Sequence, residues 1–269
     1  MLSKVFLGVA VVCLSACSDT GPSQKLVLTG SSTVAPLALE IGRRFEQQHP
    51  GVRIDVQTGG SSRGIADVRR GVSQIGMVSR ALKQKEQDLS AFIIARDGVG
   101  VVVHKDNPID NLSSSQIVDI YTGKVRNWET MSGLKAAITV VNKAEGRSTL
   151  EVFLEHFGLK NSQITADVII GDNEQAIKTV AGNVNAIAYV SVGTAEHDIA
   201  VGVPIKLVSL DGNAAATKTI ALGRYPMSRV LNLVTRHRPE GLQKQFIEFA
   251  SSTQVRDLVE GQSFVAASH

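Results

Sequence analysis

A strand-like run, a short turn rich in glycine and hydroxyl side chains, and a helix-like run follow one another three times in this chain. The turns lie at 30–33, 59–62 and 145–149. Each turn brings free backbone N–H groups and hydroxyls to the start of a helix, where the helix macrodipole adds partial positive charge. Such a helix start receives an anion, most commonly a phosphate group. The three turns together predict a site that surrounds a small oxyanion with hydrogen-bond donors.

The wider pattern alternates apolar runs with amphipathic ones. We predict strands at 25–29, 52–57, 74–79, 137–141, 167–170, 186–190 and 205–210, and helices near 34–45, 65–72, 113–121, 148–157, 173–181 and 239–260. Alternation of strands and helices predicts an α/β sheet with right-handed crossovers. Ligands of such sheets lie at the carboxyl ends of the strands, which is where the turns fall.

The order of these elements fits two α/β lobes joined by two crossings. We predict a first lobe from 25–102 and 216–269 and a second lobe from 103–215. The polar stretch 211–218 is the expected return linker, and 219–235 alternates like a strand or a hairpin.

The N-terminus predicts export. Residues 1–16 contain Lys4 followed by an apolar run of about ten residues, which fits a secretory signal and is too short for the roughly 20 that span a bilayer. The run ends in Leu14-Ser15-Ala16-Cys17, which resembles the lipobox of bacterial lipoproteins. We therefore predict lipidation at Cys17 and a tether at 17–24. The alternative is an ordinary signal peptide cut near Ala16.

Composition narrows the function classes. The two cysteines, Cys13 and Cys17, fall in or beside the signal, so we expect no disulfide, thiol nucleophile or cysteine-bound metal in the folded part. A net charge of +3 without a long basic run argues against nucleic acid as a partner. Apart from the signal, no segment of the sequence predicts a membrane span, so contact with the membrane is expected through the lipid anchor only.

Motifs along the chain point to one family. They are Thr29-Gly30-Ser31-Ser32-Thr33-Val34-Ala35-Pro36, Gly60-Ser61-Ser62, Asp97-Gly98, Asn107-Pro108, Ile120-Tyr121-Thr122-Gly123-Lys124, Asn127-Trp128, Gly146-Arg147-Ser148-Thr149 and Ala186-Ile187-Ala188-Tyr189-Val190. In this order they resemble the phosphate-binding proteins of bacterial ABC importers, a branch of the type II periplasmic binding proteins. The resemblance implies two lobes with a hinge and an interlobe ligand cleft that close on the ligand.

The resemblance also implies the ligand-binding residues. In the first lobe they are Ser32, Thr33, the N–H of Val34, and Ser61; in the second they are Lys143, Arg147, Ser148 and Thr149. Lys143 falls where the family often has a ligand-binding arginine.

Two motifs depart from the family, Ser79-Arg80 and Gly146-Arg147-Ser148-Thr149, and many relatives have Gly-Ser-Gly-Thr at the second. Many relatives have Ser-Asp where this chain has Ser79-Arg80, and the aspartate accepts the proton of hydrogen phosphate. A guanidinium at Arg80 or Arg147 offers charge-assisted donors to an oxyanion but cannot accept a proton. We predict that both arginines contact the anion; the alternative is that either one pairs with a carboxylate at the cleft edge. Selectivity for phosphate over sulfate then needs another acceptor, or it is weaker.

The sequence therefore predicts an extracytoplasmic, lipid-anchored binding protein in the periplasm or on the outer cell surface. It would capture inorganic phosphate as a monomer and deliver it to a permease and ATPase, without a cofactor, a metal or catalysis. Motifs for a hydrolase elbow, a P-loop or a zinc protease are missing from the sequence, although a Ser–His pair could still form in space. The alternatives are a binding protein for another tetrahedral oxyanion, such as sulfate or molybdate, and a phosphate-responsive sensor or adhesion protein.

Overall fold

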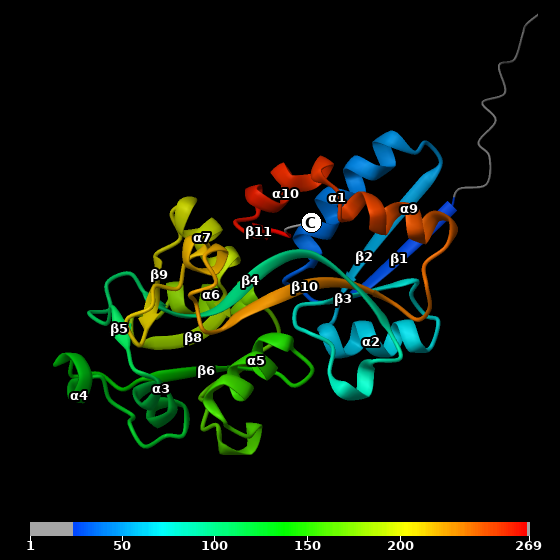
Figure 1. Cartoon of the computed structure of the whole chain (residues 1–269). Helices are drawn as coiled ribbons and strands as arrows, with labels where there is room; N and C mark the ends of the chain where they lie inside the picture. Colours follow the sequence, from blue (N-terminus) through cyan, green and yellow to red (C-terminus); the bar gives the residue numbers. More distant parts are fainter. Residues whose placement is uncertain (1–23, 268–269) are drawn as a thin grey trace, which may run out of the picture.

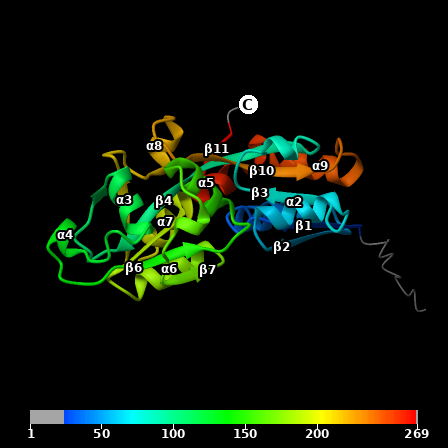
Figure 2. The same ribbon diagram turned by 90° about the horizontal axis from the view of Figure 1, so that it is seen from below.

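The computed structural model describes residues 24–267, so the signal predicted at 1–16 and the lipidation predicted at Cys17 lie outside the described part. The chain forms two α/β lobes, and β4 (Ser90–His104) and β10 (Ser228–Thr235) lie side by side where the lobes join (Figure 1). The turned view places β1, β2, α2 and α9 at one end of the molecule and α3, α4, β6 and α6 at the other (Figure 2). The predicted two-lobed α/β class is confirmed.

The first lobe contains a sheet in the order β2-β1-β3-β10-β4. Its other elements are β1 (Gln24–Gly30), α1 (Ala35–Gln48), β2 (Val52–Thr58), α2 (Ser61–Arg69), β3 (Ile75–Val78), η1 (Gln84–Glu86), α9 (Gly241–Ala250), η3 (Thr253–Val255), α10 (Arg256–Gly261) and β11 (Val265–Ala266). Residues Leu37, Ile41 and Phe45 of α1, whose spacing predicted a helix, are buried in the core. Pro36 lies in the first turn of α1, where its missing N–H costs little. Helices α1, α9 and α10 cover one face of the sheet and α2 covers the other (Figure 1).

The second lobe is built around β8, which lies between β4 and β6. Its elements are β5 (Asn111–Leu112), α3 (Ser114–Tyr121), α4 (Glu129–Ser132), β6 (Thr139–Lys143), α5 (Ser148–Phe157), η2 (Asn161–Gln163), β7 (Val168–Ile170), α6 (Asn173–Ala181), β8 (Ala186–Ser191), α7 (Val192–Ala200), β9 (Ile205–Leu210) and α8 (Thr217–Ala221). Aromatic rings fill its core: Tyr189 stacks on Phe153 at 4.0 Å, and Trp128 is fully buried. In the described part of the chain, no helix is both long enough and apolar enough to cross a membrane.

β4 belongs to the sheets of both lobes. Its first half pairs with β10 in antiparallel register, from Thr235 opposite Ser90 to Ser228 opposite Gly98. Its second half pairs with β8 and β9 in the second lobe. The ladder between β4 and β10 has a register shift at Leu231/Asn232 of β10. The two lobes are therefore joined through β4 and its pairing with β10.

Several segments differ from the sequence prediction; the helix predicted at 239–260, for example, is divided into α9 and α10 by η3. Helix α7 was not predicted; it begins where the side chain of Ser191 accepts the N–H of Thr194. The stretch 211–235 was predicted as a linker followed by a strand or hairpin. It contains helix α8, and the strand in it is β10, which begins at Ser228. Ile220, Tyr225 and Met227 explain the difference, because they pack in the core of the second lobe. We infer that the return crossing is made by β10 and not at residue 216.

Candidate functional site

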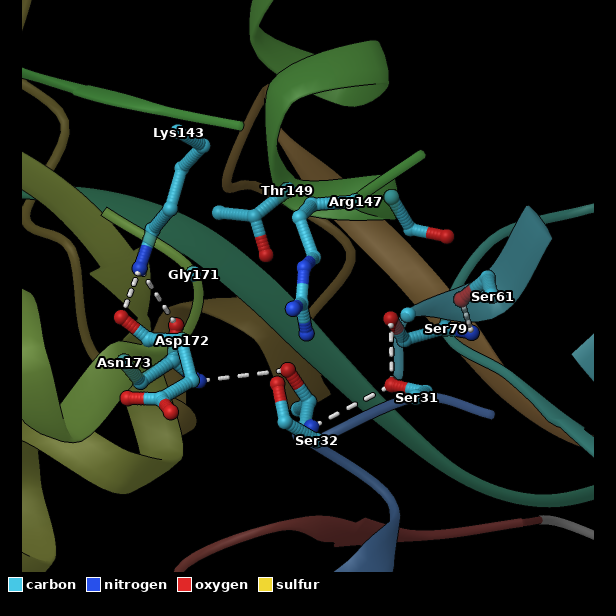
Figure 3. Close-up of a pocket in the computed structure, with 13 residues that line it drawn as sticks. Ser31, Ser32, Ser61, Ser79, Lys143, Arg147, Thr149, Gly171, Asp172 and Asn173 are labelled. Atoms are coloured by element: carbon cyan, nitrogen blue, oxygen red, sulfur yellow. Dashed lines mark hydrogen bonds between the residues drawn. The ribbon is translucent and has the colours of Figure 1, made fainter. Parts of the chain in front are cut away.

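Residues of both lobes line one cavity between the lobes (Figure 3). The lining consists of Ser31, Ser32, Thr33, Gly60, Ser61, Ser79, Lys143, Arg147, Ser148, Thr149, Gly171, Asp172 and Asn173. The three turns predicted from the sequence thus meet at one place. The space in which the centre of a water-sized sphere fits is only about 10 Å³, far below the ~300–1,000 Å³ of pockets that hold drug-sized ligands. Its size suits a guest of few atoms.

The first turn connects β1 to α1 and is organised by Ser31. The Oγ of Ser31 accepts the N–H of Thr33 at 3.2 Å and that of Val34 at 3.4 Å, and it donates to Ser79 Oγ at 2.9 Å. Ser32 and Thr33 line the cavity. Val34 does not, since its side chain is fully buried and its N–H is used by Ser31. The direct N–H contact predicted for Val34 is therefore replaced by a cap inside the turn.

The second turn connects β2 to α2 and touches the opposite lobe. Ser61 is fully buried at the start of α2, and its Oγ accepts the N–H of Ser79 at 3.2 Å. The N–H of Ser62 donates to the carbonyl of Gly146 in the second lobe at 3.2 Å. Gly60 has φ +94°, and an added Cβ would lie only 2.7 Å from that same carbonyl oxygen. Glycine is required here both by the backbone conformation and by the close approach of the lobes.

The third turn connects β6 to α5 in the second lobe. Arg147, Ser148 and Thr149 line the cavity, and Figure 3 shows the Arg147 guanidinium reaching into it. Gly171 leaves room for this guanidinium, since an added Cβ would lie 3.1 Å from Arg147 Nη2. Ser148 is 3% exposed. Among residues 24–267, its Oγ is the buried side-chain oxygen or nitrogen atom that lacks a hydrogen-bond partner.

Lys143, at the end of β6, places a buried amine beside the cavity. Its Nζ donates to the backbone carbonyl of Asp172 at 2.6 Å and to Asn173 Oδ1 at 3.3 Å (Figure 3). Burial lowers the pKa of Lys143 to about 7. The charge of Asp172 opposes this shift, whereas the positive charges of Arg229 and Arg147 add to it. An anion in the cavity would favour the charged amine.

The structure places Arg80 outside the cavity. Its guanidinium binds the carboxylate of Glu86 through two hydrogen bonds, at 2.7 and 3.0 Å, and also pairs with Glu151 of α5. Lys83 reaches the same Glu151 at 2.9 Å. These ion pairs take the place of the direct anion contact that we predicted for Arg80. They connect the loop after β3 in the first lobe to the first turn of α5 in the second.

Arg229 of β10 was not among the predicted site residues, although it lies directly behind the cavity. It pairs with Asp97 of β4 at 2.8 Å, and it donates to the hydroxyls of Thr33 and Thr149 at 3.2 Å each. The arginine is buried in β10, a strand that also buries the apolar Leu231, Leu233 and Val234. An arginine within a largely apolar strand can be read from the sequence, and it could have indicated a buried charge near the site.

The turn at 171–173, between β7 and α6, is a fourth strand–turn–helix connection that the prediction left out of the site. The Asp172 side chain caps α6 by accepting the N–H of Gln175 at 2.9 Å. The Asn173 amide donates to Thr33 Oγ1 at 3.2 Å and so links the lobes. The sequence predicts the helix that follows residue 172. Asp and Asn are common at the start of any helix, so this turn alone does not indicate a binding site.

The lining has the chemistry of an anion site. Hydroxyls, the Arg147 guanidinium and the Lys143 amine supply donors and positive charge. In the described range 24–267, no group of three or more His, Cys, Asp or Glu side chains is placed to hold a metal ion. The geometry therefore favours binding of a small oxyanion through hydrogen bonds and charge.

Comparison with known proteins agrees with this chemistry. A model of the PBP superfamily domain matches residues 17–254. The chain is 26% identical over 285 residues to the phosphate-binding protein PstS of Bacillus subtilis, a match that covers 98% of this chain and 92% of that protein. It is 24% identical over 262 residues to PstS of Borreliella burgdorferi, over 93% of this chain and 92% of that protein.

Solved structures give the same result. A putative phosphate ABC transporter substrate-binding protein with bound phosphate from Clostridium perfringens has a TM-score of 0.84 at 32% identity, and the match covers 91% of this chain and 100% of that one. An ABC-type phosphate transport receptor from Vibrio cholerae has a TM-score of 0.73 at 27% identity, over 91% and 100% of the two chains. The predicted resemblance is confirmed, and the chain belongs to the PBP superfamily, among the substrate-binding proteins that include PstS.

Proposed function

We propose that this protein captures inorganic phosphate between its two lobes and delivers it to the permease and ATPase of an ABC importer. The observation that carries the proposal is the hydroxyl of Ser148, which is buried in the cavity wall without a partner. A buried polar group without a partner is destabilising by about 1–3 kcal/mol. An oxygen of a bound anion would satisfy this hydroxyl, and the names of the similar proteins identify phosphate as the anion.

The donors around the cavity are sufficient for a useful affinity. A hydrogen bond to a charged group contributes about 1.5–3 kcal/mol, and a micromolar dissociation constant needs about 8 kcal/mol. Four such bonds, for example from Thr33, Arg147, Ser148 and Thr149, contribute about 6–12 kcal/mol, a range that includes this value. Release then requires the lobes to separate, because Ser62 and Gly146 hold the closed turns together.

The cellular setting of the proposal rests on the sequence. We assign residues 1–16 to a signal peptide, Cys17 to a lipid anchor and the folded part to the periplasm or the outer cell surface. The protein works as a monomer, and its partners are phosphate and the importer. Its mechanism is selective binding without bond-making, so it should release no product from a chromogenic phosphate ester under conditions in which it binds phosphate.

The direct test is calorimetric titration of the purified protein with phosphate, sulfate, molybdate and arsenate. Saturable binding of phosphate at micromolar concentration, with weaker binding of sulfate and molybdate, supports the proposal. Preference for sulfate or molybdate would reassign the ligand within the same fold. Binding of none of these anions at millimolar concentration would overturn the proposal.

Ser148→Ala is expected to weaken phosphate binding by about 10- to 100-fold, the equivalent of one hydrogen bond to a charged group. The folded protein should be no less stable than the wild type in the absence of phosphate, because the substitution removes a buried hydroxyl that has no partner. Ser115→Ala, at an exposed position of α3, is the control and should bind phosphate like the wild type. Unchanged phosphate affinity of Ser148→Ala would remove this hydroxyl from the ligand site.

Lys143→Arg is expected to abolish a proton uptake that accompanies phosphate binding at about pH 8. At this pH the buried amine, with its pKa near 7, is mostly neutral in the empty protein. A bound anion raises the pKa of the amine, so binding takes up a proton, and affinity falls as the pH rises through about 7. The guanidinium of the variant stays charged throughout.

Calorimetry in buffers of different ionisation enthalpy measures this proton count. The titration of phosphate itself contributes equally to both proteins, so the difference between them isolates Lys143. At about pH 5.5 both proteins should take up the same number of protons, since Lys143 is then already charged. An identical proton count for both proteins at about pH 8 would show that Lys143 does not respond to the anion.

A further inference from the structure

The two strands that join the lobes meet at a buried ion pair. Asp97 of β4 and Arg229 of β10 are register partners, and their side chains are 0% and 1% exposed. The carboxylate accepts Arg229 Nε at 3.1 Å and Nη2 at 2.8 Å. This pairing restrains the orientation of the guanidinium, since two of its neighbouring donors, Nε and Nη2, bind the carboxylate.

The remaining N–H groups of Arg229 point to hydroxyls of both lobes. Nη2 donates to Thr33 Oγ1 of the first lobe at 3.2 Å, and Nη1 donates to Thr149 Oγ1 of the second lobe at 3.2 Å. Nη1 also lies 3.4 Å from Ser79 Oγ. Thr33 and Thr149 line the cavity, whereas Arg229 does not. Arg229 can therefore act on a bound anion through these threonines.

A second donor fixes the direction of the Thr33 hydroxyl. Asn173 Oδ1 accepts from Lys143 Nζ at 3.3 Å and from the N–H of Ser191 at 3.4 Å, so its Nδ2 is the group that faces Thr33 Oγ1 at 3.2 Å. A hydroxyl has two acceptor positions and one proton. Both acceptor positions of Thr33 are filled, by Arg229 and Asn173, and its proton is left to donate.

We propose that Arg229 is a positioning residue for ligand binding: by donating from β10 to Thr33 and Thr149, it occupies acceptor positions of these hydroxyls of opposite lobes and so directs their protons toward the anion. This proposal deepens the proposed function and rests on it. The arrangement favours ligand oxygens that act as acceptors, and it makes the affinity depend on both lobes meeting at Arg229. A guanidinium suits the role because it is a permanent donor with a fixed fork geometry.

The test compares the phosphate affinity of wild type, Arg229→Lys and the double variant Asp97→Asn/Arg229→Gln. The double variant removes both charges together, so that no buried charge is left without a partner. We expect phosphate affinity to fall about 100-fold in the double variant. We expect a fall of about tenfold in Arg229→Lys, whose ammonium can keep the ion pair but cannot reach both threonines. Arg224→Gln, on the exposed loop before β10, is the control and should bind like the wild type.

A double-mutant cycle with Thr33→Val separates positioning from a merely structural role. If Arg229 acts through the Thr33 hydroxyl, Arg229→Lys should weaken binding much less in the Thr33→Val background than in the wild type. Equal losses in both backgrounds, or wild-type affinity in Arg229→Lys, would overturn the proposal. The thermal midpoint without phosphate reports folding of each variant, and Arg229→Lys carries the test if the double variant does not fold. Failure of the wild type itself to bind phosphate would instead overturn the proposed function.

Discussion

Gly60→Ala is expected to weaken phosphate binding on the order of 100-fold while the protein remains folded. In the closed arrangement an added Cβ at this position would lie 2.7 Å from the carbonyl oxygen of Gly146 and 3.0 Å from Arg147 Cδ. Both atoms belong to the opposite lobe, so the methyl group acts as a wedge that opposes closure. Overpacking of this kind destabilises by about 1–3 kcal/mol, and here the cost falls on the closed state alone. Calorimetric titration with phosphate measures the loss.

Gly51→Ala provides a matched control for the backbone. Gly51 also has a positive φ, of +85°, but an added Cβ there meets nothing within 4 Å. Both variants suffer the strain of an L-residue at a positive φ, about 1–3 kcal/mol, in the open and the closed state alike. Gly51→Ala should therefore lose stability and keep its phosphate affinity. Wild-type affinity in Gly60→Ala would show that the lobes bind phosphate without approaching as closely as the structure shows.

Arg80→Met is expected to destabilise the protein by about 3–5 kcal/mol, as breaking a buried ion pair typically does. The side chains of Arg80 and Glu86 are only 7% and 6% exposed. Without the guanidinium, the Glu86 carboxylate would remain buried with the N–H of Lys83 as its other donor, at 2.8 Å. Urea unfolding followed by circular dichroism gives the free energy of unfolding.

Two further variants sharpen this prediction. Arg69→Met breaks the ion pair with Asp88. The two side chains are 37% and 54% exposed, so the loss in free energy of unfolding should be less than about 1 kcal/mol. Arg80→Met/Glu86→Leu removes both charges of the buried pair and should recover much of the lost stability. If Arg80→Met unfolds at the same urea concentration as the wild type, the pair with Glu86 contributes no net stability.

The parts of the site that the sequence predicted depend on local chemistry. Ser61 and Thr149 stand at helix starts after short turns, and the alternation of strands and helices placed these turns at the same edge of a sheet. Cavity size, the orphaned hydroxyl of Ser148 and the approach of Gly60 to Gly146 required coordinates, because they depend on how two lobes meet.

Arg80 and Arg229 show why the rest could not be predicted. Both arginines are buried cations that needed a carboxylate partner, and many carboxylates were available along the chain. Arg80 pairs with Glu86 nearby and with Glu151 in the other lobe, and Arg229 of β10 pairs with Asp97 of β4. These choices depend on separations of 71 and 132 residues that local patterns do not encode. The boundary between lobes was similarly set by distant packing, which draws Ile220 into the second core.

The sharing of β4 between two sheets has a mechanical consequence. Because this strand is hydrogen-bonded to β10 in one lobe and to β8 and β9 in the other, the lobes cannot slide past each other without breaking a ladder. Bending and twisting of the ribbon remain, and the register shift at Leu231/Asn232 is where its ladder is interrupted. Motion is thus confined to bending and twisting of this ribbon, and each reopening returns the empty turns to the same starting alignment.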